Sequence, residues 1–408
     1  MSQKPGSLLG GALLITGSCV GAGMLGLPIL TGLAGFFPAL LMFFAAWIFM
    51  TLTAFLLVEA NGWFSKKVNL LSIVAYSLGK WGKAFCWVAY LFLFYALLVA
   101  YVSASGSLCS TFLQGFYLIS LPPWVGSVFF VFLFGGVVYQ GTRHVDLWNR
   151  VLMTGKIIFF LVLVWIGALY IKPELLTRQD LSLSLFSLPI LIISFGFHNM
   201  IPTLTDYMKG DIKRVKKAIL IGGLLAFSIY LIWEILVLGI VPLTGPNGLI
   251  ETLQLDKEGS QALSAILPFK SISFFAQGLA FFAILTSFLA QALSLVHFLA
   301  DGLQISHKKK ENFFLCLLAL LPPLALSLSY PKLFFKALDF AGGICAVILF
   351  GVLPVLIVWL GRKQHKSSPT YTLFGGNALL LSICLFSLFI FCFELLVLLG
   401  VYNLPRFS

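Results

Sequence analysis

Long apolar runs separated by short polar segments repeat along the whole chain. Several runs reach the roughly 20 residues that a helix needs to cross a bilayer. Because the runs are continuous and do not alternate with period two, they favour membrane helices over a β-barrel. The pattern predicts an all-α integral membrane protein with eleven spans, near residues 7–35, 38–60, 84–112, 124–141, 146–171, 187–208, 215–241, 271–300, 313–330, 334–360 and 372–400.

The composition agrees with this pattern. Of the 408 residues, 60% are hydrophobic and 10% are charged, whereas a soluble domain averages about 25% charged residues. The connecting segments are short, so we expect one transmembrane domain over 1–408, and we expect the longest outer loop, 243–270, to be a plain solvated loop. The seven cysteines form no CxxC pair and are typical of small apolar residues, so we expect no metal site and no cofactor.

The positions of the basic residues predict the topology. If the N-terminus is cytoplasmic, eighteen lysines and arginines lie in cytoplasmic segments and seven in outer segments. Short cytoplasmic loops carry an excess of basic residues, so the bias places the N-terminus inside and, with an odd number of spans, the C-terminus outside. The net charge of +12 is therefore explained by topology, and we expect no nucleic-acid partner.

The first span is unusual because Gly17, Gly21, Gly23 and Gly26 precede Pro28 within it. Glycine costs about 1 kcal/mol in a helix relative to alanine. Backbone that leaves the helix inside a membrane is tolerated only where it lines a cavity of the protein. The stretch therefore indicates half of a substrate site, although Gly17 and Gly21 also fit a helix-packing face.

The sixth span contains a second interruption, Ser194 to Pro202, with glycine, histidine and asparagine inside it. If 7–171 and 187–360 are inverted repeats, followed by an extra span at 372–400, the two interruptions occupy corresponding positions. Paired Gly/Pro-interrupted spans in two halves are the best sequence indication of a transporter binding site.

The chemistry of two broken helices suits a zwitterionic amino acid. N–H groups that open a second half-helix attract a carboxylate, and carbonyls that end a first half-helix attract an ammonium group. We expect Phe195 and Phe197 to flank the substrate side chain, and His198 either titrates usefully or is a structural hydrogen-bonding residue. The candidate substrate-binding residues at the two breaks are Gly17, Ser18, Gly21, Ala22, Gly23, Phe195, Gly196, Phe197 and His198.

These motifs resemble those of a known family. Residues 17–28 and 194–202, with 95–103 and 233–239, are similar to the first, sixth, third and seventh spans of the bacterial hydroxy and aromatic amino acid permeases, and most similar to the tyrosine-specific members. The resemblance implies a leucine-transporter-type fold, with 5+5 inverted repeats, helices 1 and 6 broken and one extra helix. It also implies proton symport of tyrosine or tryptophan across the bacterial cytoplasmic (inner) membrane, and it adds Tyr101 to the candidate substrate-binding residues.

Lys156 is the only basic residue well inside a span. A charge at the bilayer centre costs roughly 2.5–3.5 kcal/mol on insertion scales, so such residues are functional candidates. In proton-coupled relatives a fifth-span lysine takes the place of a sodium ion, and Lys156 resembles it by position. The alternative is that Lys156 extends to the cytoplasmic interface. Thr286 and Ser287 in the eighth span could face the same place, or serve helix packing.

Asp339 and Glu234 lie near outer span ends and are candidates for an extracellular gate. For Glu234 the alternatives are a proton site or a position at the outer interface. The other functions to weigh are a sodium-coupled or serine/threonine-type permease and, more remotely, a polytopic membrane enzyme. An enzyme is disfavoured because the carboxylates and histidines are dispersed, and the chain has no GxxxxGK[ST] nucleotide motif.

Overall fold

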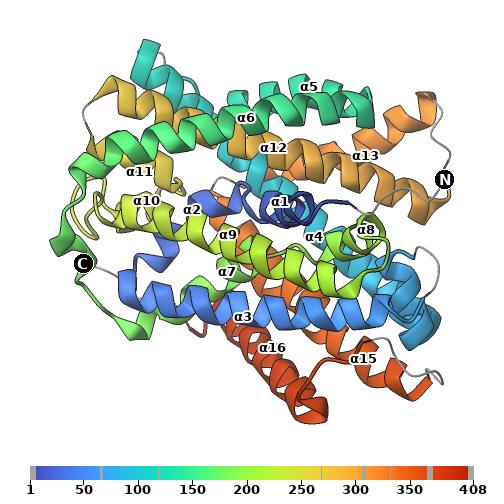
Figure 1. Cartoon of the computed structure of the whole chain (residues 1–408). Helices are drawn as coiled ribbons and strands as arrows, with labels where there is room; N and C mark the ends of the chain where they lie inside the picture. The colour runs from blue at the N-terminus through green and yellow to red at the C-terminus, as the bar shows by residue number, and fades with distance from the viewer. Residues whose placement is uncertain are drawn as a thin grey trace.

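The computed structural model describes residues 6–64, 68–117, 120–267, 269–305, 309–330, 332–364 and 371–402. Throughout these ranges the regular structure is helical, as Figure 1 shows. Six of the basic residues that count toward the predicted topology lie outside them: Lys4, Lys66, Lys67, Lys308, Lys366 and Arg406. The predicted all-α class is confirmed.

Within the described ranges, nine helical segments are long and apolar enough to cross a membrane, and the bent pair α1–α2 makes a tenth. The membrane-spanning segments are α1 (Leu8–Cys19) with α2 (Gly23–Thr31), α3 (Phe36–Asn61), α4 (Leu70–Tyr117), α6 (Thr142–Gly167), α7 (Leu188–Ser194) with α8 (Ile201–Tyr207), α9 (Ile212–Leu238), α12 (Lys270–Leu303), α13 (Lys309–Ser329), α14 (Phe334–Asp339) with η5 (Phe340–Val352) and α15 (Leu353–Gln364), and α16 (Gly376–Leu398).

The remaining predicted span is α5 (Pro123–Tyr139), an apolar helix of 17 residues. This is short of the roughly 20 residues that cross a bilayer. The eleventh span and the inverted repeat therefore stay predictions.

Both predicted interruptions are present. The first span bends by 61° between α1 and α2, where Val20, Gly21 and Ala22 leave the helix. In the sixth span α7 ends at Ser194, a 3₁₀ turn η4 (His198–Met200) follows, and α8 begins at Ile201. Helix-breaking residues are tolerated at membrane depth when the protein covers the released backbone groups.

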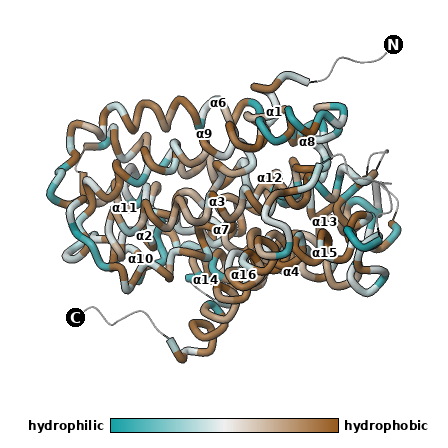
Figure 2. The backbone as a smooth tube through the Cα atoms, turned by 60° about the horizontal axis from the view of Figure 1, so that its bottom comes forward, coloured by the Kyte–Doolittle hydropathy of each residue, from teal (hydrophilic) through white to brown (hydrophobic). Residues whose placement is uncertain are grey.

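The broken helices lie inside the bundle. In Figure 1, α5, α6, α12 and α13 form one side, α3, α15 and α16 form the other, and α1, α2 and α7 lie between them. α1 packs on α9, and α6 packs on α12. Figure 2 shows hydrophobic residues along the helices and hydrophilic residues toward the two ends of the bundle. Below, the "α1 end" is the end of the bundle where α1 begins, and the "α2 end" is the opposite one, where α2 ends.

The segment 243–270 at the α2 end is not the plain solvated loop that the sequence predicts. It contains α10 (Leu249–Gln254) and α11 (Gly259–Ile266), and Asp256 and Glu258 are only 9% and 2% exposed. The Asp256 carboxylate accepts hydrogen bonds from the N–H groups of Phe334 and Phe335, which open α14. The prediction is wrong because these carboxylates cap helices and so pack the segment against the bundle.

Candidate functional site

A cavity of about 400 Å³ lies where the two broken spans meet. This volume lies within the range typical of small-molecule sites. Side chains and backbone from both interruptions and from α4, α6 and α12 surround it. The lining residues that the sequence predicts are Gly17, Ser18, Gly21, Gly23, Tyr101, Lys156, Gly196, Thr286 and Ser287.

The break in the first span is held by α12. The Ser287 Oγ accepts a hydrogen bond from the Ala22 N–H at 2.9 Å. A Cβ on Gly21 would lie 2.6 Å from the same Oγ, so only glycine allows this approach. The Gly21 N–H donates to the Cys19 carbonyl at 2.8 Å. The Val20 N–H donates to the Thr16 carbonyl, so all three N–H groups at the break are occupied. The N–H of Gly23, at the start of α2, has no acceptor within its own helix.

Lys156 also reaches the first-span break. Its Nζ donates to the Val20 carbonyl at 2.7 Å, and the residue is 4% exposed. The side chain therefore lies against the interruption and not along a path to the membrane surface. A cation on this released carbonyl satisfies a backbone group that a continuous helix would have bonded internally.

Tyr101 and Thr286 complete the predicted cluster. Tyr101 lines the cavity and interacts with the Ser287 hydroxyl, which connects α4 to α12 and the first-span break. The Thr286 Oγ1 donates to the Ala283 carbonyl of its own helix at 3.1 Å. Residues predicted from the sequence on α4, α6 and α12 therefore converge on the first-span break.

Tyr230 on α9 joins the two interruptions. Its hydroxyl lies 2.6 Å from the carbonyl of Cys19, the last residue of α1, and 2.7 Å from the carbonyl of Ser194, the last residue of α7. A hydroxyl has one proton to donate, and Cys19 already accepts from the Gly21 N–H. The Tyr230 hydroxyl can therefore donate to only one of these two carbonyls, and the other lies at hydrogen-bonding distance without a proton between the oxygens. The adjacent Ser194 Oγ is buried without a partner.

The aromatic residues of the sixth span lie behind the cavity wall. Phe195, Phe197 and His198 are 0%, 1% and 0% exposed, and of the residues described they are not among those that line the cavity. The His198 ring stacks on Phe350 with centroids 4.7 Å apart, and its Nε2 lies 2.8 Å from the Thr53 Oγ1. Phe350 does line the cavity, so His198 supports the wall from outside.

The two gate candidates lie toward the α2 end and are not among the described residues that line the cavity. The Glu234 carboxyl contacts the Thr31 hydroxyl of α2, and its Oε2 is buried without a partner. Asp339 follows Leu338, which lines the cavity, and its Oδ1 is also buried without a partner. Neither residue is exposed on the protein surface.

Several cavity residues were missed by sequence reasoning. The polar ones are Asn149, Asn199, Gln291 and Ser294, and the aromatic ones are Tyr90, Phe94 and Phe350. Helical spacing could have found three of them. Asn149 precedes Lys156 by two turns, and Gln291 and Ser294 follow Ser287 by one and two turns, which places each on the same helix face.

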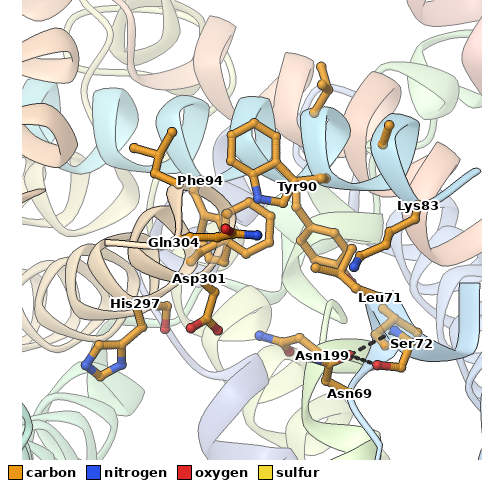
Figure 3. Close-up of a pocket in the computed structure, with 18 of the residues that line it drawn as sticks. Asn69, Leu71, Ser72, Lys83, Tyr90, Phe94, Asn199, His297, Asp301 and Gln304 are labelled. Atoms are coloured by element: carbon orange, nitrogen blue, oxygen red, sulfur yellow. Dashed lines mark hydrogen bonds between the residues drawn. The ribbon is translucent and has the colours of Figure 1, made fainter. Parts of the chain in front are cut away.

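A second cavity of about 1060 Å³ opens at the α1 end, and Figure 3 shows its lining. It shares Tyr90, Phe94, Asn199 and Ser294 with the central cavity. Asp301 and Gln304, at the end of α12, and Lys83 of α4 also line it. The second cavity, here called the vestibule, therefore adjoins the central cavity on the side where α1 begins.

Residues 4–394 match the model of the tryptophan/tyrosine permease family. The chain belongs to this family. A tyrosine-specific transport system of Haemophilus influenzae is 30% identical over 92% of this chain and 93% of its own length. A tryptophan-specific transport protein of the same organism is 30% identical over 95% of both chains. A low affinity tryptophan permease of Escherichia coli is 26% identical over 95% of both chains.

The comparisons settle the class of the protein. This permease is a multi-pass membrane protein and a transport protein, and not an enzyme. The central cavity, and not a cluster of catalytic carboxylates, is the feature to explain. In the described part of the permease no group of histidine, cysteine or carboxylate side chains could hold a metal ion.

Proposed function

We propose that this permease imports an aromatic amino acid with protons across the bacterial cytoplasmic membrane, with its N-terminus in the cytoplasm. The observation that carries the proposal is the cavity at two helix breaks with the Lys156 ammonium on a released carbonyl. Tyrosine is the first substrate to test and tryptophan the second, because similar relatives are named for each.

The substrate's charged groups have complementary partners at the breaks. Its carboxylate would bind at the start of α2, where Gly23 presents an N–H and the positive end of the helix dipole. Its ammonium would bind the carbonyls of Cys19 and Ser194, where Tyr230 supplies one proton for two acceptors. The ammonium group would donate to the carbonyl that the Tyr230 hydroxyl leaves without a proton, and so would reduce the repulsion between the two oxygens. The aromatic ring would lie between the apolar lining residues Tyr90, Phe94, Leu97 and Phe350.

Lys156 would couple transport to the proton. An ammonium at the first-span break repels sodium, which argues against a sodium-coupled permease. One charge moved across 100 mV contributes about 2.3 kcal/mol. At about 1.4 kcal/mol per tenfold change, this supports roughly fifty-fold accumulation of a neutral zwitterion. Without coupling, such a substrate would only equilibrate.

The vestibule at the α1 end corresponds to an inward-facing arrangement under this topology. The predicted cytoplasmic side carries the vestibule residues Lys80, Lys83 and Asp301, whereas α10 and α11 pack over the α2 end. The substrate would therefore leave past Phe94 and Asn199 toward the cytoplasm.

Uptake into proteoliposomes tests this proposal. We expect tyrosine uptake to rise with an inward proton gradient and to be independent of sodium, and competition with tryptophan, phenylalanine and serine to rank the substrates. Lys156→Ala should abolish gradient-driven accumulation while counterflow of tyrosine persists. Lys213→Ala, an exposed lysine near the start of α9, is the control and should transport normally. Sodium-dependent uptake, or full accumulation by Lys156→Ala, would exclude the coupling role.

A further inference from the structure

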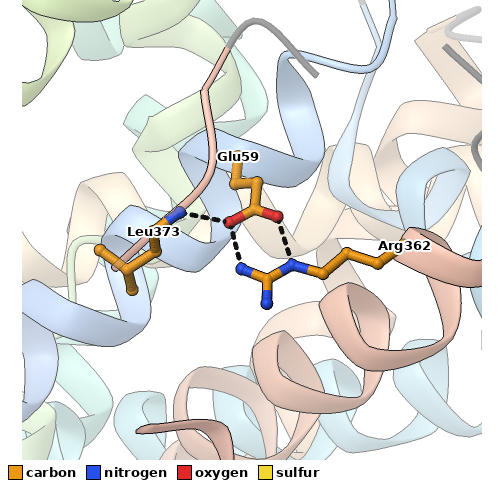
Figure 4. Close-up of polar contacts among 3 residues, drawn as sticks. All are labelled: Glu59, Arg362 and Leu373. Atoms are coloured by element: carbon orange, nitrogen blue, oxygen red, sulfur yellow. Dashed lines mark hydrogen bonds and ion pairs between the residues drawn. The ribbon is translucent and has the colours of Figure 1, made fainter. Parts of the chain in front are cut away.

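Two of the buried glutamates, Glu59 and Glu234, lie at opposite ends of the bundle, and their surroundings differ. Glu59, at the α1 end, is 1% exposed and has three donors: the Arg362 Nε at 2.7 Å, the Arg362 Nη2 at 2.8 Å and the Leu373 N–H at 2.8 Å. Figure 4 shows this ion pair. A buried carboxylate with a guanidinium and a further donor is ionised.

Glu234, near the α2 end of α9, is also 1% exposed but has no such partners. Neither of the two ion pairs found among the described residues includes it. Its Oε1 contacts the Thr31 Oγ1, and its Oε2 is buried without a hydrogen-bond partner. An ionised carboxylate buried with so little compensation would cost several kcal/mol.

The contacts of Thr31 indicate where the proton is. Thr31 is 0% exposed, and its Oγ1 also lies 2.7 Å from the Leu27 carbonyl. The hydroxyl has one proton and cannot donate both to this carbonyl and to Glu234. If Glu234 is a neutral acid, its O–H donates to the Thr31 Oγ1 and the Thr31 O–H donates to Leu27, so each proton has an acceptor.

The charged groups on the elements around the outer part of α9 do not change this assignment. Each of the nearest ones is engaged elsewhere or exposed. Arg178 donates to the Gly32 carbonyl, Glu258 accepts from Ser260, and Lys156 donates to Val20. Lys172 and Glu174, beside η2 (Pro173–Leu176), are exposed. α2 itself contains no titratable residue.

We propose that Glu234 is a second proton-binding site of this permease, separate from Lys156. In the arrangement seen here the carboxyl is protonated and its hydrogen bond to Thr31 holds the end of α2 against α9. Release of the proton leaves an ionised Glu234, which competes with Leu27 for the one Thr31 proton and favours separation of α2 from α9. The site would therefore make the α2 end of the transporter sensitive to pH.

Infrared spectroscopy of the purified full-length protein tests the protonation directly. At neutral pH the wild-type spectrum should contain a protonated-carboxyl C=O component that Glu234→Gln lacks. The control Glu174→Gln removes an exposed glutamate beside α9 and should leave this component unchanged. Thr31→Val should keep the component and move it to higher frequency, because the carboxyl loses its hydrogen-bond partner. If Glu234→Gln instead loses ionised-carboxylate absorption, the proposal is overturned.

The pH profile of tyrosine uptake gives a second measurement. Wild-type uptake should fall as the pH on the α2 side becomes alkaline, and Glu234→Gln, which mimics the neutral acid, should show a flatter profile. Accumulation that depends on Lys156 should persist in Glu234→Gln, so failure of one proposal does not imply failure of the other. An unchanged profile in Glu234→Gln would contradict a role for this proton in transport.

Discussion

The two ends of this permease stabilise buried carboxyls in different ways. At the α1 end, Glu59 is neutralised by Arg362. At the α2 end, Glu234, Asp339 and Glu394 each have a buried oxygen without a partner among the described residues. An ion pair fixes charge in place, whereas a buried acid without a cation can change its charge only by exchanging a proton. The buried carboxyl at the α1 end therefore has a fixed cationic partner, whereas those three at the α2 end have none in the described part of the chain, which supports the protonation proposed for Glu234.

Removing the cation at the α1 end should have the largest effect on stability. Arg362→Ala leaves Glu59 buried and unpaired, and breaking a buried pair in this way costs about 3–5 kcal/mol. We expect a large drop in the thermal unfolding temperature of the purified protein. Arg150→Ala breaks an exposed pair with Asp146, whose side chains are 77% and 58% accessible, and should change stability by less than about 1 kcal/mol. Equal effects in the two variants would contradict the conclusion that burial makes the Glu59–Arg362 pair important for stability.

Glu258, which caps α11 at the α2 end, should give the next largest effect. Burial raises its pKa to about 7 from 4.5, despite hydrogen bonds from Ser260 that lower it. Because the folded pKa is above the unfolded one, its contribution to stability is complete below about pH 4 and is lost as pH rises toward 7. Stability measured across this window should fall by on the order of 2–3 kcal/mol in the wild type.

Glu258→Gln should flatten that fall. Its amide cannot ionise, and its side-chain oxygen still accepts from the Ser260 N–H. The matched control is Glu251→Gln on α10, a less buried residue of the same segment. If Glu251→Gln flattens the profile and Glu258→Gln does not, the assignment of the pH dependence to Glu258 is wrong.

The sequence predicted the breaks in the first and sixth spans because a break depends on local composition. It also predicted residues on α4, α6 and α12 that lie at the first break. Glycine and proline inside an apolar run mark a broken span wherever it packs. Lys156 and Ser287 were found because a polar group in a membrane helix needs a partner. Nothing local distinguishes Glu234 from Glu59, since their difference lies in which long-range group, Arg362 or Thr31, packs against each carboxyl.

Phe195 and Phe197 show what local composition does not determine, namely which way a side chain at a break points. Their position in the sixth-span break suggested contact with the substrate, but a break fixes where the backbone leaves the helix and not the direction of each side chain. Phe195 packs on Tyr230, with ring centroids 5.2 Å apart, and Phe197 stacks beside His198. The aromatic rings that do line the cavity come from α4 and η5, which approach the break only in the folded bundle.

The smallest expected effect comes from two tyrosines, Tyr95 and Tyr230, whose hydroxyls differ in the number of carbonyls that they contact. The Tyr95 hydroxyl donates to one carbonyl, that of Leu318, at 2.8 Å, whereas the Tyr230 hydroxyl serves two. Tyr230→Phe and Tyr95→Phe each remove one hydrogen bond of about 1 kcal/mol, so their thermal stabilities should fall similarly. Only Tyr230→Phe changes the spacing of the carbonyls at Cys19 and Ser194, and its apparent affinity for tyrosine should weaken by roughly tenfold, equivalent to about 1.4 kcal/mol.

A ligand without the ammonium group separates this effect from general loosening of the helices. Binding of 3-(4-hydroxyphenyl)propionate should be weak in the wild type and should change little in Tyr230→Phe, because that ligand makes no use of the two carbonyls. If Tyr95→Phe weakens tyrosine binding as much as Tyr230→Phe does, the hydroxyl at the breaks only supports the fold. If Tyr230→Phe weakens both ligands equally, the ammonium does not bind beside it, since a partner of the ammonium must discriminate between ligands with and without that group.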